Sequence, residues 1–197
     1  MVHIDPKEIA GPWVTGFALD DHTVSSSRLA GRDAGRPAFD TTRSEMGELL
    51  YRLKFGNDMS VLTTIVAAAA RFVRSLDLAP DLLVPVPPSK MTRGLLVPPA
   101  IAEGIAERIG VPVCLDCVTK EKQTPELKNV SDRRERLDLL DGAYRASERH
   151  VAGKKVLLVD DLYRSGATLR AVTNALYQQG DAAEVRALTL TRTRSLR

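Results

Sequence analysis

From Asp81 onward, short apolar segments alternate with segments of helical periodicity, and this alternation limits the chain to a small set of folds. Four segments read as strands because they are short, apolar and rich in β-branched residues: DLLVPV (81–86), VPVCLDCV (111–118), KKVLLVD (154–160) and AEVRALTLT (183–191). Two read as helices: AIAEGIAERIG (100–110) and SGATLRAVTNALYQQ (165–179), the second ended by Gly180. Strands that alternate with helices build a parallel sheet from βαβ units. The sequence therefore predicts an α/β fold with a Rossmann-like central parallel sheet and helices on both faces.

The N-terminal part of the chain follows a different pattern. PWVTGFALDDHTVSSS (12–27) alternates apolar and polar residues around Asp20 and Asp21, which predicts two short strands joined by a turn. SRLAGRDAGRPAFDTTR (27–43) is rich in Gly, Arg and Ala and predicts a loop, and a helix is expected after it. MSVLTTIVAAAARFVRSL (59–76) predicts a second helix, for which Asp58 and Ser60 are candidate caps. We therefore expect an N-terminal extension over residues 1–43, with a hairpin and a loop, and a main domain over residues 44–197.

Length and composition favour a single soluble domain, since the chain has 197 residues of which 44% are hydrophobic. The longest apolar stretch, Val61 to Ala70, is too short to cross a bilayer, and the N-terminus lacks a signal-peptide pattern. We therefore expect a cytoplasmic protein with no membrane partner. The net charge of +3 comes from 28 basic and 25 acidic residues spread along the chain, so nucleic acid is not expected as a direct ligand.

Two cysteines, Cys114 and Cys117, have CxxC spacing, which raises zinc binding and redox chemistry as alternatives. A structural zinc ion needs four ligands, and the three histidines His3, His22 and His150 form no pair at ligand spacing. The neighbouring valines predict a strand, in which residues three apart point to opposite faces. The favoured interpretation is two reduced thiols that pack as small apolar side chains.

The segment VLLVDDLYRSGATLRAV (156–172) contains the pattern with the clearest chemistry. Ligands of open α/β sheets bind beyond the carboxyl ends of the strands, where this strand would deliver Asp160 and Asp161. The turn that follows contains a glycine, which permits close backbone approach, and two hydroxyl residues, Ser165 and Thr168. A turn of this kind at a helix N-terminus can hold a phosphate, and the carboxylates before it can accept hydrogen bonds from sugar hydroxyls or bind Mg²⁺.

Three other interpretations of this segment compete with a phosphate site. An apolar run that ends in Asp-Asp is also typical of the Mg²⁺-binding strand of NTPases, but the chain has no GxxxxGK[ST] motif to hold their phosphates. A phosphoacceptor site of the signalling-receiver type would leave the Ser-Gly-Ala-Thr turn unexplained. A purely structural strand, acidic loop and capped helix is the remaining alternative.

The whole segment resembles the signature of type I phosphoribosyltransferases that binds 5-phosphoribosyl 1-diphosphate (PRPP): four apolar residues, two acids and a Thr/Ser-Gly-x-Thr turn. ComF-like members are the most similar, because YRLKFGND (51–58) resembles their motif before the domain. LLVPVPP (82–88), followed by Arg93 and Gly94, resembles their pyrophosphate loop. The resemblance implies the type I phosphoribosyltransferase fold with a mobile loop over the site, and a Mg²⁺-dependent transfer of ribose 5-phosphate from PRPP to a nitrogenous acceptor.

The resemblance also implies a role for particular residues. Asp160 and Asp161 would contact the ribose 2- and 3-hydroxyls and would hold Mg²⁺, directly or through water. The 5-phosphate would bind the turn after the strand, made of Arg164, Ser165, Gly166, Ala167 and Thr168. Pyrophosphate would meet the loop of Pro88, Ser89, Lys90 and Arg93. The charged segment 119–142 would supply the mobile loop through basic residues that include Lys120, Lys122, Lys128, Arg133, Arg134 and Arg136, although a solvated helix face is an alternative for each.

The sequence also departs from the family pattern. It lacks the N-terminal four-cysteine zinc module of ComF-like proteins, and its aromatic segment 12–22 is instead expected to pack near the site and shape the acceptor pocket. Arg164 stands where purine-salvage members often have an acid, and an arginine cannot take up the proton of a base.

The expected partners are PRPP and an unidentified acceptor, with a homodimer as one expected assembly. The alternative function is a non-catalytic PRPP-binding regulator, or an accessory protein of DNA uptake.

Overall fold

The computed structural model describes residues 2–33, 36–76, 78–88, 96–122, 140 and 142–194. The strands are β1 (Lys7–Glu8), β2 (Thr15–Asp21), β3 (Thr23–Asp33), β4 (Arg36–Arg43), β5 (Leu82–Pro85), β6 (Val118–Lys120), β7 (Tyr144–Ala146), β8 (Lys155–Tyr163) and β9 (Glu184–Arg192). The helices are α1 (Glu45–Phe55), the 3-10 turn η1 (Met59–Val61), α2 (Leu62–Ser75), α3 (Val97–Ile109), α5 (Glu148–Val151) and α6 (Ala167–Gln178).

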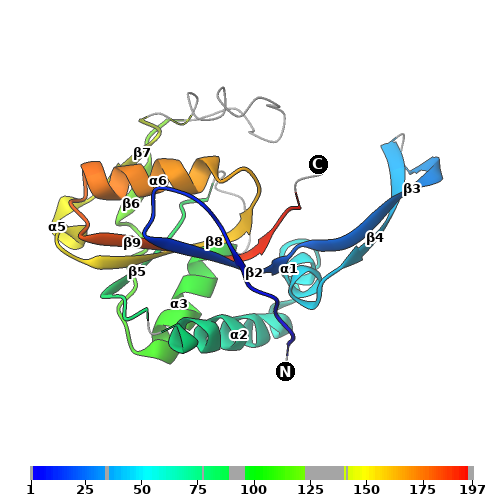
Figure 1. Cartoon of the computed structure of the whole chain (residues 1–197), viewed down its shortest axis with the longest axis horizontal. Coiled ribbons are helices and arrows are strands. Elements are labelled where there is room, and N and C mark those ends of the chain that lie inside the picture. Colours follow the sequence, from blue (N-terminus) through cyan, green and yellow to red (C-terminus); the bar gives the residue numbers. More distant parts are fainter. Residues whose placement is uncertain are drawn as a thin grey trace.

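The main sheet has five strands in the order β1-β2-β9-β8-β5. β2, β9, β8 and β5 are parallel, and β1 is the one antiparallel strand at the edge. α6 covers one face and α2 and α3 cover the other, which confirms the predicted α/β architecture (Figure 1). Two further pairs, β3 with β4 and β6 with β7, form separate two-stranded ribbons.

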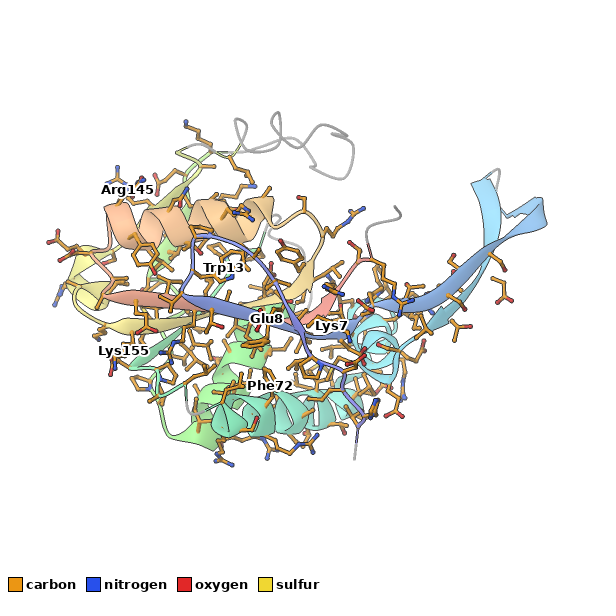
Figure 2. The ribbon with its side chains drawn as sticks, in the orientation of Figure 1. Lys7, Glu8, Trp13, Phe72, Arg145 and Lys155 are labelled. Carbon is orange, nitrogen blue, oxygen red and sulfur yellow. A yellow bond between two sulfur atoms is a disulfide. The ribbon has the colours of Figure 1, made fainter. Side chains whose placement is uncertain are left out.

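The alternation of side chains along β8 divides the core between the two faces of the sheet. Val156 and Leu158 pack with α6 residues, whereas Leu157 and Val159 pack with residues of α2 and α3. All four side chains are buried, because β8 lies in the interior of a parallel sheet that is covered on both sides. Figure 2 shows Trp13 on the α6 side and Phe72 of α2 on the opposite side.

Local signals in the sequence explain where the helices begin and end. The Ser44 hydroxyl accepts a hydrogen bond from the Gly47 N–H and so caps α1, and the Asp58 carboxylate accepts from the Ser60 N–H at the start of η1. α3 has proline in its first turn and ends at Gly110. Among the described residues, no helix combines the length and the apolar composition that a membrane span requires.

The N-terminal region differs from the sequence prediction. β2 does not pair with the next strand to form a hairpin; it lies parallel to β9 in the main sheet. The prediction of a loop over residues 27–43 was wrong. β3 and β4 form a long antiparallel hairpin there, which projects away from the main sheet and its helices (Figure 1). The division between residues 1–43 and 44–197 stays a prediction.

The strand predicted over residues 111–118 was also wrong for most of its length. Val113 makes one isolated parallel bridge with Leu83, and β6 begins only at Val118. Residues 115–117 form a bend between them, which brings the Cα atoms of Cys114 and Cys117 to 5.5 Å. The two cysteines form a disulfide, so the prediction of reduced thiols is corrected: in a bend, residues three apart can face each other.

Candidate functional site

β8 delivers two adjacent carboxylates to the edge of the sheet where the parallel strands end. Its apolar residues 156–159 are fully buried, and the burial decreases at Asp160 and Asp161. In register with β9, Asp160 lies beside Thr189 and Leu162 beside Thr191. Ligands of open α/β sheets bind at this end of the strands, so the carboxylates occupy the position expected for a ligand site.

The Asp160 carboxylate is largely withdrawn from solvent and is hard to ionise in this environment. Burial, and second the charge of Asp161, raise the pKa of Asp160 from 3.8 to about 8. The Asp161 N–H donates a hydrogen bond of 2.8 Å to Asp160 Oδ1, and this bond and the charge of Lys54 oppose the rise. A cation or a hydroxyl donor placed beside Asp160 would favour its charged form.

The Asp161 carboxylate faces the other side of the sheet, toward α1. Lys54 Nζ lies 2.6 Å from Asp161 Oδ2, in an ion pair whose carboxylate side chain is only 14% exposed. Lys54 belongs to the segment YRLKFGND (51–58) and was not predicted as a site residue. That motif was the available signal, because the two residues are 107 positions apart in the chain.

The turn after β8 has the geometry of an anion cradle. Gly166 adopts the left-handed conformation, with φ of 73°, and α6 begins directly after it. A Cβ atom at this position would lie 2.6 Å from Tyr163 Cε2, so the turn leaves no room for a larger residue. The Gly166 position provides no side-chain cap for α6, and Ser165 Oγ is 3.5 Å from the Ala167 nitrogen. The N–H groups and positive dipole end of α6 are therefore arranged as in phosphate-binding turns.

Two further members of the turn differ in their exposure. The Arg164 side chain is exposed. Thr168 is partly buried and interacts with the hydroxyl of Tyr144, whose pKa rises to about 12 because of burial and the nearby Asp160 charge. Tyr144 lies on β7 and was not predicted as a site residue. Its contact joins the β6–β7 ribbon to the turn.

The structure describes only part of the predicted pyrophosphate loop and mobile loop. Pro88 follows β5, whose last residue pairs with Val159, so it lies at the same edge of the sheet as the carboxylates. Lys120 ends β6, and its pKa is lowered by burial. Lys122 lies near Gly142 at the other end of the segment. The remaining predicted residues of both loops lie outside the described ranges: Ser89, Lys90, Arg93, Lys128, Arg133, Arg134 and Arg136.

The N-terminal segment packs against the end of β8. Trp13 meets Tyr163 edge to face, with ring centroids 6.5 Å apart, and the Tyr163 hydroxyl donates to the Ala10 carbonyl at 3.4 Å.

His22, directly after β2, has its Nδ1 atom 3.2 Å from Thr191 Oγ1. Burial, followed by the charges of Arg43 and Lys54, lowers the pKa of His22, so the imidazole is neutral at pH 7. His22 was not predicted as a site residue, and no local motif marks it.

β2 ends in a second pair of adjacent aspartates with the same local geometry as the first. The Asp21 N–H donates to Asp20 Oδ1 at 2.8 Å, as Asp161 does to Asp160. The Asp21 carboxylate is already neutralised, because Arg192 Nε and Arg194 Nε each lie 2.8 Å from one of its oxygens. Burial would raise the pKa of Asp21, but these hydrogen bonds lower it. The pair on β2 is therefore a structural ion cluster, unlike the pair on β8.

The acidic pair on β8 fits a magnesium ion by the chemistry of its donors. Mg²⁺ prefers carboxylate oxygens, and it is usually bound by one or two carboxylates together with water and substrate phosphates. Asp161 already faces one cation, Lys54, whereas the charged form of Asp160 is disfavoured by burial and by Asp161. A divalent cation at this position would remove that penalty.

Comparison with known families gives a match over most of the chain. Residues 59–197 match the model of the phosphoribosyl transferase domain. The chain is 30% identical over 156 residues to the competence protein ComFC of Bacillus subtilis, with 77% of this chain and 62% of that protein covered. The chain therefore spans less than two thirds of the length of that relative.

Solved structures agree at the level of the fold. A structure of adenine phosphoribosyltransferase matches with a TM-score of 0.50 and 15% identity, over 87% of this chain and 86% of that one. The glutamine PRPP amidotransferase of B. subtilis, complexed with ADP and GMP, matches with a TM-score of 0.50 and 19% identity over 78% of this chain and 34% of that one. These likenesses show the fold alone.

Proposed function

This chain belongs to the phosphoribosyl transferase domain family, in its type I fold, and from that membership we propose that it binds PRPP and transfers ribose 5-phosphate to a nitrogenous acceptor. The observation that carries the proposal is the arrangement at the end of β8. Two carboxylates and a left-handed glycine turn stand within seven residues, at the sheet edge where α6 begins. A sugar phosphate, which carries its hydroxyls and its phosphate on one small molecule, fits such an arrangement better than a lone anion does.

In this proposal, each side of PRPP meets a different part of the site. Asp160 and Asp161 accept hydrogen bonds from the ribose 2- and 3-hydroxyls. The 5-phosphate binds the N–H groups and hydroxyls of the turn from Ser165 to Thr168, with Arg164 beside it. Hydrogen bonds donated by the ribose hydroxyls favour the charged form of Asp160, so PRPP binding draws the proton off Asp160. Because the pKa of Asp160 is raised to about 8, the affinity for PRPP rises with pH up to about pH 8.

The pyrophosphate end is assigned to the loop that begins at Pro88 and contains Ser89, Lys90 and Arg93. Basic residues of segment 119–142, among them Lys120, Lys122, Arg133 and Arg134, would neutralise the leaving group and exclude water. Asp160 and Asp161 would hold Mg²⁺, which would supply charge neutralisation of the pyrophosphate. The protein contributes chiefly positioning, since a ribosyl cation-like transition state needs little covalent help.

His22 is the candidate group on the acceptor side. In the transfer, the bond from C1 to the pyrophosphate oxygen breaks, a bond from C1 to the acceptor nitrogen forms, and the acceptor loses a proton. His22 is neutral at pH 7 because burial lowers its pKa, so it can take up that proton. Its position near Lys54 and Asp161 places it at the same edge of the sheet as the proposed ribose site. Arg164 cannot take this role, because it stays protonated.

The experiment is pyrophosphate release from PRPP and Mg²⁺ over a panel of nucleobases and related heterocycles. The blank is the double variant Asp160→Asn/Asp161→Asn, and Asp5→Asn, an exposed aspartate that pairs with Lys7, is the matched control. We expect one compound to stimulate release by the wild type and by Asp5→Asn, with no stimulation in the double variant.

Binding and turnover are separated by calorimetry of PRPP with Mg²⁺. PRPP binding that requires Asp160 and Asp161, without stimulated release, would support the second candidate, a PRPP-binding regulator. The similarity to ComFC, which is called a competence protein, favours keeping this candidate. If the wild-type protein binds no PRPP, both candidate functions are contradicted.

A further inference from the structure

Cys114, Cys117 and His150 lie together at the base of the β6–β7 ribbon. The two strands are antiparallel, and Val118 pairs with Ala146, so the residues before β6 and after β7 meet at the same end. The Ser147 N–H donates a hydrogen bond of 2.8 Å to the Cys117 carbonyl, which fixes the start of α5 against the cysteine bend. His150 lies in α5, one helical turn from that contact.

These three residues form a set of donors of the kind that binds zinc. The two sulfur atoms and one ring nitrogen of His150 all lie within 4.8 Å of one another. In a tetrahedral zinc site, with Zn–S of about 2.3 Å and Zn–N of about 2.1 Å, ligand atoms are roughly 3.5 Å apart. The set is therefore close to the required size, and the sulfur atoms need only move apart when the disulfide is reduced.

The surroundings of the set also favour a cation. The Asp116 Oδ1 atom lies 3.5 Å from Cys114 Sγ and adds negative charge beside the sulfur atoms. The Ser147 hydroxyl lies 3.2 Å from His150 Nδ1, and an imidazole that binds a metal through its other nitrogen usually has such a partner. A disulfide alone requires neither an imidazole nor a carboxylate next to it. Cys117 is buried, but His150 is exposed, so an ion can reach the set from solvent.

We propose that Cys114, Cys117 and His150 are a redox-controlled binding site for a zinc-class divalent cation. The disulfide and the cation complex are two alternative states of the site. A dithiol reductant gives two electrons and two protons to the disulfide, which becomes two thiols while the reductant becomes a disulfide. The cation then binds the two sulfur atoms as thiolates, the neutral imidazole and one water molecule as the fourth ligand, and two protons leave to solvent.

The two states hold the ribbon differently. The disulfide closes only the local bend, because its cysteines are three residues apart. The cation would join that bend to α5, and thus tie together the two ends of the segment that contains β6 and β7. β7 carries Tyr144, which contacts Thr168 of the turn. The cation would therefore fix the position of the base of the β6–β7 ribbon relative to the turn that follows β8.

The experiment uses the full chain, reduced with a phosphine under anaerobic conditions, and Co²⁺ as a spectroscopic probe that Zn²⁺ then displaces. We expect one equivalent of Co²⁺ to bind with a sulfur-to-cobalt charge-transfer band and the ligand-field bands of tetrahedral coordination. Zn²⁺ should abolish both, and the oxidised protein should show neither. Absence of these bands in the reduced wild type would overturn the proposal.

Variants test which residues bind the ion. Cys114→Ser/Cys117→Ser should lose the charge-transfer band. Because Cys117 is buried and its replacement can disturb folding, His150→Gln on an exposed side chain is the decisive variant, with circular dichroism as the check of its fold. His150→Gln should weaken Co²⁺ binding at least tenfold, whereas His3→Gln, on an exposed histidine in the N-terminal segment, should bind as the wild type does. Equal affinity in the two histidine variants would overturn the site. None of these readouts depends on PRPP.

Discussion

At the scale of single residues, the shape of the turn after β8 depends on the absence of a Cβ atom at Gly166. The residue has φ of 73°, in the region that other residues rarely adopt, and the space that a Cβ would fill is occupied by the Tyr163 ring. Tyr163 in turn packs against Trp13. The shape of the turn is therefore fixed from both sides before any ligand binds, which lowers the entropy cost of binding an anion there.

Gly166→Ala should lower stability and PRPP affinity together. The left-handed conformation costs an alanine about 1–2 kcal/mol, and the new Cβ must also displace the Tyr163 ring. Gly153→Ala is the matched control, because Gly153 has φ of 70° but nothing within 4 Å of its Cβ position. We expect both variants to melt at lower temperature, and only Gly166→Ala to lose at least tenfold in PRPP affinity by calorimetry. Equal PRPP affinity in the two variants would contradict the proposed phosphate site.

At the scale of elements, α1 connects the N-terminal half of the chain to the end of β8 through one ion pair. Lys54 and Lys7 form ion pairs of the same length, 2.6 Å, and their side chains are 32% and 33% exposed. Their partners differ, because Asp161 is 14% exposed and Asp5 is 61% exposed. An ion pair with a partly buried carboxylate is screened less by water, so the two pairs should differ in their contribution to stability.

Lys54→Gln should therefore destabilise the protein more than Lys7→Gln does. We expect the melting temperature to fall by about 2–4 °C in Lys54→Gln, as for a loss of about 1 kcal/mol, and by less than about 1 °C in Lys7→Gln. Excess MgCl₂ should restore part of the loss in Lys54→Gln, because a cation near Asp160 and Asp161 replaces the missing charge. A magnesium response of equal size in the wild type and both variants would argue against a metal site at these carboxylates.

The elements also show which parts of the structure the sequence could predict. β5, β8, β9, α3 and α6 were predicted because their apolar spacing matches their burial. The β3–β4 hairpin was missed because residues 27–43 are rich in Gly, Arg and Ala, a composition typical of a loop and not of a strand, and because pairing between the two strands is not visible in local composition. Residues 111–118 were misread because a valine-rich segment favours a strand whether or not it finds a partner.

The residues of the candidate site also fall into two groups, those that the sequence could predict and those that it could not. Asp160, Asp161 and the turn from Arg164 to Thr168 are contiguous, so a local motif was enough to single them out, and their roles stay a proposal. Lys54, Tyr144 and His22 reach the same edge of the sheet from α1, β7 and the end of β2. Contacts of that kind depend on the packing of elements, and one sequence contains no spacing that indicates them.

At the scale of the whole molecule, the partly buried carboxyl of Asp160 makes global stability depend on pH. Burial and Asp161 raise the pKa of Asp160 from 3.8 to about 8 in the folded state. The folded protein therefore keeps a proton that the unfolded chain releases. This contribution to folding is most favourable below about pH 4, and it is lost as the pH rises to about 8.

Asp160→Asn removes this penalty, so its advantage over the wild type should grow with pH. We expect the difference in melting temperature to increase by at least about 3 °C between pH 4 and pH 8, as for about 1 kcal/mol, and to stay constant above pH 8. The measurement is a series of thermal melts of both proteins in buffers of equal ionic strength, with Asp5→Asn as the control. Parallel curves for Asp160→Asn and the wild type would show that Asp160 is ionised in the free protein.

The pairing of β2 with β9 also sets an order for the assembly of the chain on the ribosome. Thr15 pairs with Arg186, so β2 has to wait for a partner strand that is synthesised much later than β2 itself. Until residues 184–192 emerge, both β2 and β8 lack the neighbour that lies between them, and the apolar side chains of Ala18 and Leu19 have no completed core. Pairing between distant segments is slow, and open strand edges invite association between chains. β9 is therefore the strand that closes the sheet, and a chain arrested before it would present two open strand edges, one on β2 and one on β8.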